Sequence, residues 1–315
     1  GEYNGKIVPV MQACGHDTHT AILMGTAEIL TSIKSELKGT VKFIFQPAEE
    51  GPPEGEEGGA KLMVKEGVLE NPKVDVIFGL HINAQTEVGK IKYRPKGTMA
   101  ASDLYTIKIN GKQTHGAYPW LGIDPITTAA QIIMGIQTIV SRNLNITESA
   151  AVISVGQINA GVRSNVIPEE LTMTGTIRSL DSKVQDMMHS RLKKVVSSIA
   201  ESAGATAEIK ITNQTLITYN DPLLTEKMVP TLEITAGKDN VSITPAVTGA
   251  EDFSYFQEKI PGLYFFLGGA PKGKPIEETA PHHTPDFYID ESSFVLGMKA
   301  LSNLTIDYME MNAKK

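Results

Sequence analysis

The order of strand and helix patterns over residues 103–212 constrains the fold of this chain more than any other feature of its sequence. Apolar, β-branched runs predict strands at 103–109, 150–158, 171–178 and 206–211, and helical spacing predicts helices at 123–142 and 181–203. The order strand-helix-strand-strand-helix-strand is that of the ferredoxin-like split motif. We therefore predict a self-contained βαββαβ domain over residues 98–213.

The segments on both sides of this domain have an α/β pattern. Helices are expected at 18–33, 60–66, 221–235 and from residue 290, and apolar strands at 40–46, 74–80, 241–244 and 263–267. Strands that alternate with helices in this way build a mostly parallel sheet. The predicted fold class is therefore α/β, with residues 1–97 and 214–315 forming one domain that the βαββαβ domain interrupts.

The stretch Met11–His19 gathers side chains that bind metal ions or carry protons. Cys14 is the only cysteine among 315 residues, so it has no internal disulfide partner, and His16 lies two positions further on. A thiolate and an imidazole together suit zinc or a similar divalent metal. For Cys14 taken alone, the alternative is a buried cysteine that behaves as a small apolar side chain.

Further candidate ligands occur where strands are predicted to end. Glu49 and Glu50 follow one strand, and His81 ends another. His282 and His283 precede a proline-fixed turn. Adjacent carboxylates point in different directions, so one can hold a metal while the other takes a proton from water. Solvated surface residues are the alternative for each of these side chains alone, but sites in α/β sheets lie beyond strand ends, where these residues would converge.

Charge and hydropathy argue against two classes of partner. The formal net charge is −7 and no block of lysine and arginine occurs, whereas nucleic-acid binding needs clustered cations. No run of about eighteen apolar residues and no signal-peptide pattern is present, so no membrane span is expected. One unpaired cysteine fits a reducing compartment, and we expect a cytoplasmic protein.

Five motifs occur in the same order as in one known enzyme family. They are Cys14-Gly15-His16-Asp17-x-His19, Gln46-Pro47-Ala48-Glu49-Glu50-Gly51, Gly79-Leu80-His81, Gly249-Ala250-Glu251-Asp252-Phe253 and His283-Thr284-Pro285-x-Phe287. Over essentially the whole chain they resemble the metal-dependent amidohydrolase branch of the aminoacylase/carboxypeptidase clan of metallopeptidases. That branch includes hippurate hydrolases, N-acyl-amino-acid deacylases and the hydrolases of auxin–amino acid conjugates.

The resemblance implies a site with two divalent metal ions per subunit and with Glu49 as the general base. The implied metal ligands are Cys14, His16, Glu50, His81 and His283. Zinc is favoured because these ligands are soft to intermediate, and manganese and cobalt remain open. His282 is expected to be a neighbour of the site, since His283 is the better match to the motif.

The inserted domain also carries motifs that resemble those of the family, where it is a lid and dimerisation domain. Gly111-x-x-x-His115-Gly116-Ala117-x-Pro119 resembles the motif whose histidine stabilises the oxyanion in the partner subunit's site. By the same resemblance, Asn165 and Arg178 are candidates for binding a substrate carboxylate, with a turn asparagine and a strand-edge arginine as the alternatives. The resemblance therefore implies a homodimer formed through the inserted domain.

These features together predict an enzyme that hydrolyses an N-acyl amino acid, or a small peptide-like amide, to a carboxylic acid and an amino acid. A water that loses its proton to Glu49 would attack the amide carbon, His115 would stabilise the oxyanion, and Glu49 would protonate the departing amine. A carboxypeptidase or dipeptidase is the alternative with the same chemistry. A metal-binding dimeric scaffold without turnover is the alternative from a different class.

The start of the chain carries a separate expectation. Proteins of the family that this chain resembles have a substantial segment ahead of the point that corresponds to Cys14, with an Arg-x-Asp-x-Asp-Ala-Leu-Pro motif. Only thirteen residues precede Cys14 here, and no such motif occurs. We therefore expect a fragment of a longer protein that binds metal poorly and hydrolyses weakly or not at all, because it would lack a carboxylate that supports the site.

Overall fold

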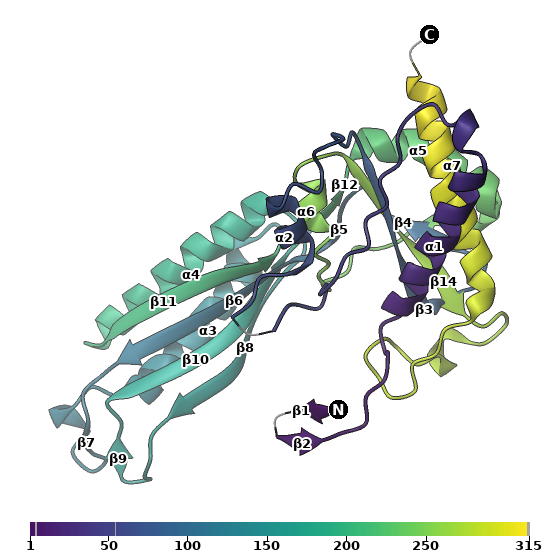
Figure 1. The fold of residues 1–315 in the computed structure, drawn as a ribbon. Helices are drawn as coiled ribbons and strands as arrows, with labels where there is room; N and C mark the ends of the chain where they lie inside the picture. The colour runs from purple at the N-terminus through teal and green to yellow at the C-terminus, as the bar shows by residue number, and fades with distance from the viewer. Residues whose placement is uncertain (4, 54, 314–315) are drawn as a thin grey trace. The chain divides into compact units, whose positions relative to one another are not determined.

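The computed structural model describes residues 1–3, 5–53 and 55–313, and the chain divides into two compact units (Figure 1). The first unit comprises Gly1–Lys96, Tyr219–Pro245 and Tyr255–Lys315, and the second comprises Gly97–Thr218 and Ala246–Ser254. Three short elements lie where the chain passes from one unit to the other: β5 (Lys96–Met99), β12 (Thr218–Asn220) and α6 (Ser254–Gln257).

The second unit has the predicted ferredoxin-like fold. Its elements are β6 (Ala101–Asn110), β7 (Thr114–His115), α3 (Pro125–Asn143), β8 (Ala151–Ala160), β9 (Val166–Ile167), β10 (Glu170–Ser179), α4 (Ser182–Ser202) and β11 (Thr206–Thr215). An antiparallel sheet has the strand order β11-β6-β10-β8, and β7 pairs separately with β9. The βαββαβ order predicted from the sequence is therefore confirmed.

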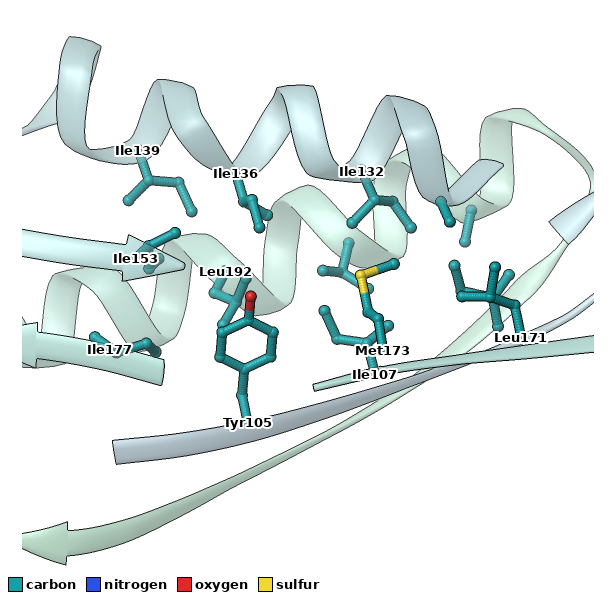
Figure 2. Close-up of a cluster of buried hydrophobic side chains, with 14 of the residues drawn as sticks. Tyr105, Ile107, Ile132, Ile136, Ile139, Ile153, Leu171, Met173, Ile177 and Leu192 are labelled. Atoms are coloured by element: carbon teal, nitrogen blue, oxygen red, sulfur yellow. The ribbon is translucent and has the colours of Figure 1, made fainter. Parts of the chain in front are cut away.

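A core of aliphatic side chains joins α3 and α4 to this sheet. Ile132, Ile136 and Ile139 of α3 point towards the strands in Figure 2, where Ile107 and Met173 face them from the two central strands. All five side chains are fully buried. Since burial of a side chain of this size contributes roughly 1.5–3 kcal/mol, this cluster is a main source of stability for the second unit.

The first unit is built on a four-stranded sheet in the order β13-β4-β14-β3. Its elements are β1 (Glu2–Tyr3), β2 (Lys6–Ile7), α1 (His16–Ser32), α2 (Gly59–Lys65), β3 (Ile77–Glu87), β4 (Ile91–Tyr93), α5 (Pro222–Ala236), β13 (Val241–Ile243), β14 (Gly262–Ala270) and α7 (Phe294–Asn312). β13 is parallel to β4 and β14 is parallel to β3, whereas β14 and β4 are antiparallel. Two of these three pairings are parallel, which agrees with the predicted α/β class.

Helices α1, α5 and α7 pack on this sheet through a second apolar cluster. β14 is buried along its whole length. On α7, Leu301 and Leu304 are buried and Phe294, Met298 and Tyr308 pack against the cluster. These five residues recur at helical spacing, so one apolar face of α7 packs on the sheet. Across the part of the chain that the structure describes, every helix is too short or too polar to span a membrane.

Two predictions about strands in the first unit are wrong. The structure has no strand over residues 40–46, and Lys42 in this segment donates hydrogen bonds to the carbonyl oxygens of Val68 and Glu70. An apolar, β-branched sequence favours a strand only where a neighbouring strand can pair with it. The strand predicted to end before His81 is β3, which continues to Glu87, so that His81 lies inside the strand.

Candidate metal centre

The candidate ligands Cys14 and His16 lie on either side of Gly15, at the start of helix α1. Gly15 is the N-cap residue, with a φ of 99°, and His16 is the first helical residue. A Cβ atom on Gly15 would lie 2.5 Å from Cγ2 of Ile82, the residue that follows His81 in β3. Because glycine has no Cβ, the start of α1 can lie directly against β3.

This close approach places the side chains of Cys14 and His81 face to face. The distance from Cys14 Sγ to His81 Nε2 is 3.4 Å, and His81 Nδ1 lies 2.5 Å from the carbonyl oxygen of Ile82. A carbonyl oxygen can only accept, so Nδ1 carries the proton and the lone pair of Nε2 faces Cys14. Burial lowers the pKa of His81 to about 3, so its ring is in the neutral form that metal binding requires.

Glu49 and Glu50 occupy the two middle positions of a turn over residues 48–51, which a 3.1 Å backbone hydrogen bond closes. Glu49 Oε2 lies 3.5 Å from His16 Nε2, and Glu50 Oε1 lies 3.1 Å from His283 Nε2. The two carboxylates therefore face different histidines. This turn, and not the end of a strand at 40–46, separates the directions of the two side chains.

The candidate ligands form overlapping groups of potential donor atoms. Donors within 4.8 Å of one another come from Cys14, His16 and His81, from Cys14, Glu50 and His283, and from His16, Glu49 and Glu50. Nε2 of His16 is buried without a hydrogen-bond partner among the described residues, as expected of a donor atom that faces an ion. A set of thiolate, imidazole and carboxylate donors with shared members fits two adjacent divalent ions.

The other predicted site residues, His115, Asn165 and Arg178, belong to the second unit. The N–H of Gly116, which follows His115, donates to the carbonyl oxygen of Asn165 at 2.8 Å, so His115 and Asn165 are neighbours. Arg178 is the second-last residue of β10. Partial burial lowers the pKa of its guanidinium group, and the negative charge of Asp103 opposes this effect. Within the second unit, the structure therefore brings two of these three residues together.

Two histidines make contacts at the site that the sequence did not predict. Nε2 of His19 accepts a hydrogen bond from Ile82 N at 2.9 Å, and Nε2 of His282 accepts one from Ala84 N at 3.0 Å. Burial lowers the pKa of both rings. His19 lies three positions after His16, and His282 directly precedes His283, so nearness in the sequence to a candidate ligand was the available signal. Their hydrogen-bond partners are 63 and 198 residues away and cannot be deduced from spacing.

We expect the metal-free protein to lose stability as the pH falls. The pKa of His81 is about 3 in the fold and 6.5 in its ordinary state, so between these values the unfolded chain binds a proton that the folded chain does not. The free energy of unfolding should therefore decrease by up to about 1.4 kcal/mol per pH unit from this residue. Urea unfolding with a chelator, at several pH values below neutral, measures the slope. An equal slope in His81→Gln would contradict this assignment.

The fold and this donor set define a class of protein, the metal-dependent hydrolases, in which ions held by imidazole, thiolate and carboxylate groups lie beside a carboxylate that can accept a proton. The sequence model of one protein family, Peptidase family M20/M25/M40, matches residues 2–307 of this chain. The chain belongs to this family, and it is therefore a hydrolase.

Individual proteins of known sequence or structure are similar over nearly the whole chain. Thermostable carboxypeptidase 2 of Saccharolobus solfataricus is 39% identical over 308 residues, which cover 98% of this chain and 76% of that protein. N-acetylcysteine deacetylase of Bacillus subtilis is 35% identical over 309 residues, which cover 98% and 77%. The structure of the Bacillus subtilis YXEP protein, described as a dinuclear metal binding peptidase from the M20 family, matches with a TM-score of 0.78 and 33% identity, covering 97% of this chain and 75% of that one.

Proposed function

We propose that this protein hydrolyses the amide bond of N-acyl amino acids with the help of two divalent metal ions. The observation that carries the proposal is the direction of the adjacent carboxylates, Glu49 towards His16 and Glu50 towards His283. With this arrangement one carboxylate could bind a metal while the other moves a proton, which supports the proposal. The similarity to a carboxypeptidase and to an N-acetylcysteine deacetylase supports an amide substrate.

The metal ions would be held by five side chains. These are Cys14, His16, Glu50, His81 and His283, whose donor atoms form the overlapping groups described above. Bound ions would polarise the amide carbonyl and make a water molecule more acidic. The mixture of thiolate, imidazole and carboxylate donors favours zinc over manganese and cobalt. The similarity to a dinuclear metal binding peptidase supports two ions.

Glu49 is the general base of the proposed reaction. Its carboxylate takes a proton from the attacking water and then delivers it to the nitrogen of the departing amine. His115, supplied by the second subunit of a homodimer, donates a hydrogen bond to the carbonyl oxygen as negative charge develops on it. Asn165 and Arg178 bind the substrate carboxylate, to which the guanidinium group offers two parallel hydrogen bonds.

A panel of N-acyl amino acids, dipeptides and longer peptides, each assayed with added zinc, manganese or cobalt, tests this function. Faster hydrolysis of N-acyl amino acids would support it. Faster release of the last residue from longer peptides would favour the second candidate, a carboxypeptidase, which the similarity to thermostable carboxypeptidase 2 supports. Stoichiometric metal binding without turnover of any substrate would show a metal-binding scaffold instead.

A mixture of two inactive variants should regain activity if subunits share their sites. His115→Ala and Glu49→Gln each remove one group of the proposed mechanism, but in a heterodimer one of the two sites holds both intact groups. We therefore expect hydrolysis to appear after the two variants are mixed and allowed to exchange subunits. Each variant incubated alone is the control. If light scattering shows that the protein is a monomer, or exchange is verified and no activity returns, the shared site is wrong.

A further inference from the structure

Strand β3 is an edge strand of the described four-stranded sheet. Two histidine side chains lie along the edge of β3 that faces away from β14. β3 pairs with β14 on one side, in the order β13-β4-β14-β3. On the other side, Ile82 N donates to His19 Nε2 and Ala84 N donates to His282 Nε2. These are the backbone donors of alternate residues, which point to the same edge of a strand. The two imidazoles therefore take hydrogen bonds that a neighbouring strand would otherwise accept.

The contacts of His282 fix the state of its ring. Nδ1 lies 2.9 Å from the carbonyl oxygen of Cys14, which can only accept, so Nδ1 carries the proton. Nε2 accepts from Ala84 N at 3.0 Å. Both nitrogens are engaged with backbone groups, so this ring could bind a metal ion only by breaking one of these hydrogen bonds.

His282 also lies where the segments that carry three of the proposed ligands meet. It links the carbonyl oxygen of Cys14 to β3, three residues beyond His81. The next residue, His283, donates its backbone N–H to the carbonyl oxygen of Ala13 at 2.8 Å. The His282 ring therefore joins the segment that carries Cys14 to the strand that carries His81, by one hydrogen bond on each side.

We propose that His282 is a positioning residue of the metal centre, which joins the Cys14 segment to the outer edge of β3 and does not itself bind metal. The proposal rests on the proposed metal site. It goes beyond that site because it assigns the role to a side chain outside the ligand set and to one tautomer of its ring. Polar groups that orient ligands in this way typically change metal affinity by about 10–100-fold when they are removed.

Zinc binding and amide hydrogen exchange in three variants test the proposal. His282→Phe removes both hydrogen bonds, His282→Gln keeps an acceptor at the position of Nε2, and His282→Asn keeps a donor at the position of Nδ1. In metal-free His282→Phe, we expect the Ala84 amide to exchange about 3–10-fold faster, which corresponds to the loss of one hydrogen bond. We expect His282→Gln to restore slow exchange at Ala84, and His282→Asn to leave it fast.

Metal titration separates a positioning role from a ligand role. His282→Phe should still bind two zinc ions at saturation, with affinity lowered about 10–100-fold. The matched variant of the adjacent residue, His283→Phe, should lose one ion and leave exchange at Ala84 unchanged. Loss of one ion in His282→Phe would overturn the proposal by making His282 a ligand, and unchanged zinc affinity and Ala84 exchange would overturn it by showing no positioning role. If His282→Phe does not fold, the other two variants test the proposal: slow Ala84 amide exchange in His282→Gln and fast exchange in His282→Asn would support it, and equal exchange in both would overturn it.

None of these measurements uses a substrate. A wild-type protein that binds two zinc ions but hydrolyses no amide would therefore contradict the proposed function and leave the role of His282 intact. Conversely, an active enzyme whose His282→Phe variant has unchanged zinc affinity and Ala84 exchange would contradict only the role of His282.

Discussion

Glu49→Gln is expected to lower kcat by a factor of about 10²–10⁴ while the metal content of the protein stays unchanged. Glutamine has nearly the same shape as glutamate, but its amide cannot take a proton from water at neutral pH. The carboxylate of Glu49 lies 3.5 Å from His16, and a neutral side chain in this place should leave the proposed ligands in position. Metal analysis and steady-state hydrolysis of an N-acyl amino acid measure both quantities.

The adjacent residue supplies the matched control, because Glu50→Gln makes the same chemical change one position further along the turn. Its carboxylate faces His283 at 3.1 Å and belongs to the group of donors with Cys14. We expect Glu50→Gln to weaken metal binding, and its activity to recover in part when excess metal is added. The opposite result, in which Glu49→Gln loses metal and Glu50→Gln retains it, would reverse the two roles.

The second large effect is expected from Gly15→Ala, which should destabilise the fold by about 2–5 kcal/mol and weaken metal binding. One part of the cost is the left-handed backbone, which disfavours a side chain by about 1–2 kcal/mol. The other part is the 2.5 Å approach of the new Cβ to Ile82 Cγ2, and forcing a packed side chain aside costs about 1–3 kcal/mol. Because Ile82 is fully buried and follows His81, its displacement should disturb the Cys14–His81 pair.

A matched variant separates these two contributions. Gly89 has a φ of +88°, and a Cβ there would meet no heavy atom within 4 Å. Gly89→Ala should therefore show only the backbone cost, with unchanged metal affinity. Urea unfolding of both variants, together with zinc titration, gives the comparison. Equal losses of stability, with zinc affinity retained in both, would show that the contact between Gly15 and Ile82 does not support the site.

The second unit was predictable because each of its long helices and strands carries a clear sequence pattern. Helices such as α3 and strands such as β10 carry long periodic or β-branched sequences, and the predicted segments agree with the structure to within a few residues. Residues 40–46 have an equally clear strand pattern and form no strand. The difference is that β10 pairs with β6 and β8, whereas residues 40–46 pair with no strand, and the sequence of a segment does not contain its pairing partner.

The sequence predicted which residues belong to the candidate site, but not the hydrogen bonds that hold these residues in place. The motifs suggested Cys14, His81 and His283 together, and the structure places each of them in a group of donors within 4.8 Å. The roles of His19 and His282 were not predictable, because each depends on a backbone N–H of β3. Every residue except proline has a backbone N–H, so no residue pattern marks such contacts in advance.

The hydrogen bond between the His282 ring and the carbonyl oxygen of Cys14 determines how late in folding the site can form. The two residues are 268 positions apart, and the β3 residue that completes the link, Ala84, is 198 positions from His282. During synthesis the segment with Cys14 and His81 leaves the ribosome long before His282 is synthesised. The second unit can fold in this interval. Closing so large a loop is entropically costly and slow, so the site should form among the last events of folding. Until then the single thiol is neither tied to its neighbours nor shielded by them, and oxidation or capture by a stray metal ion competes with correct assembly.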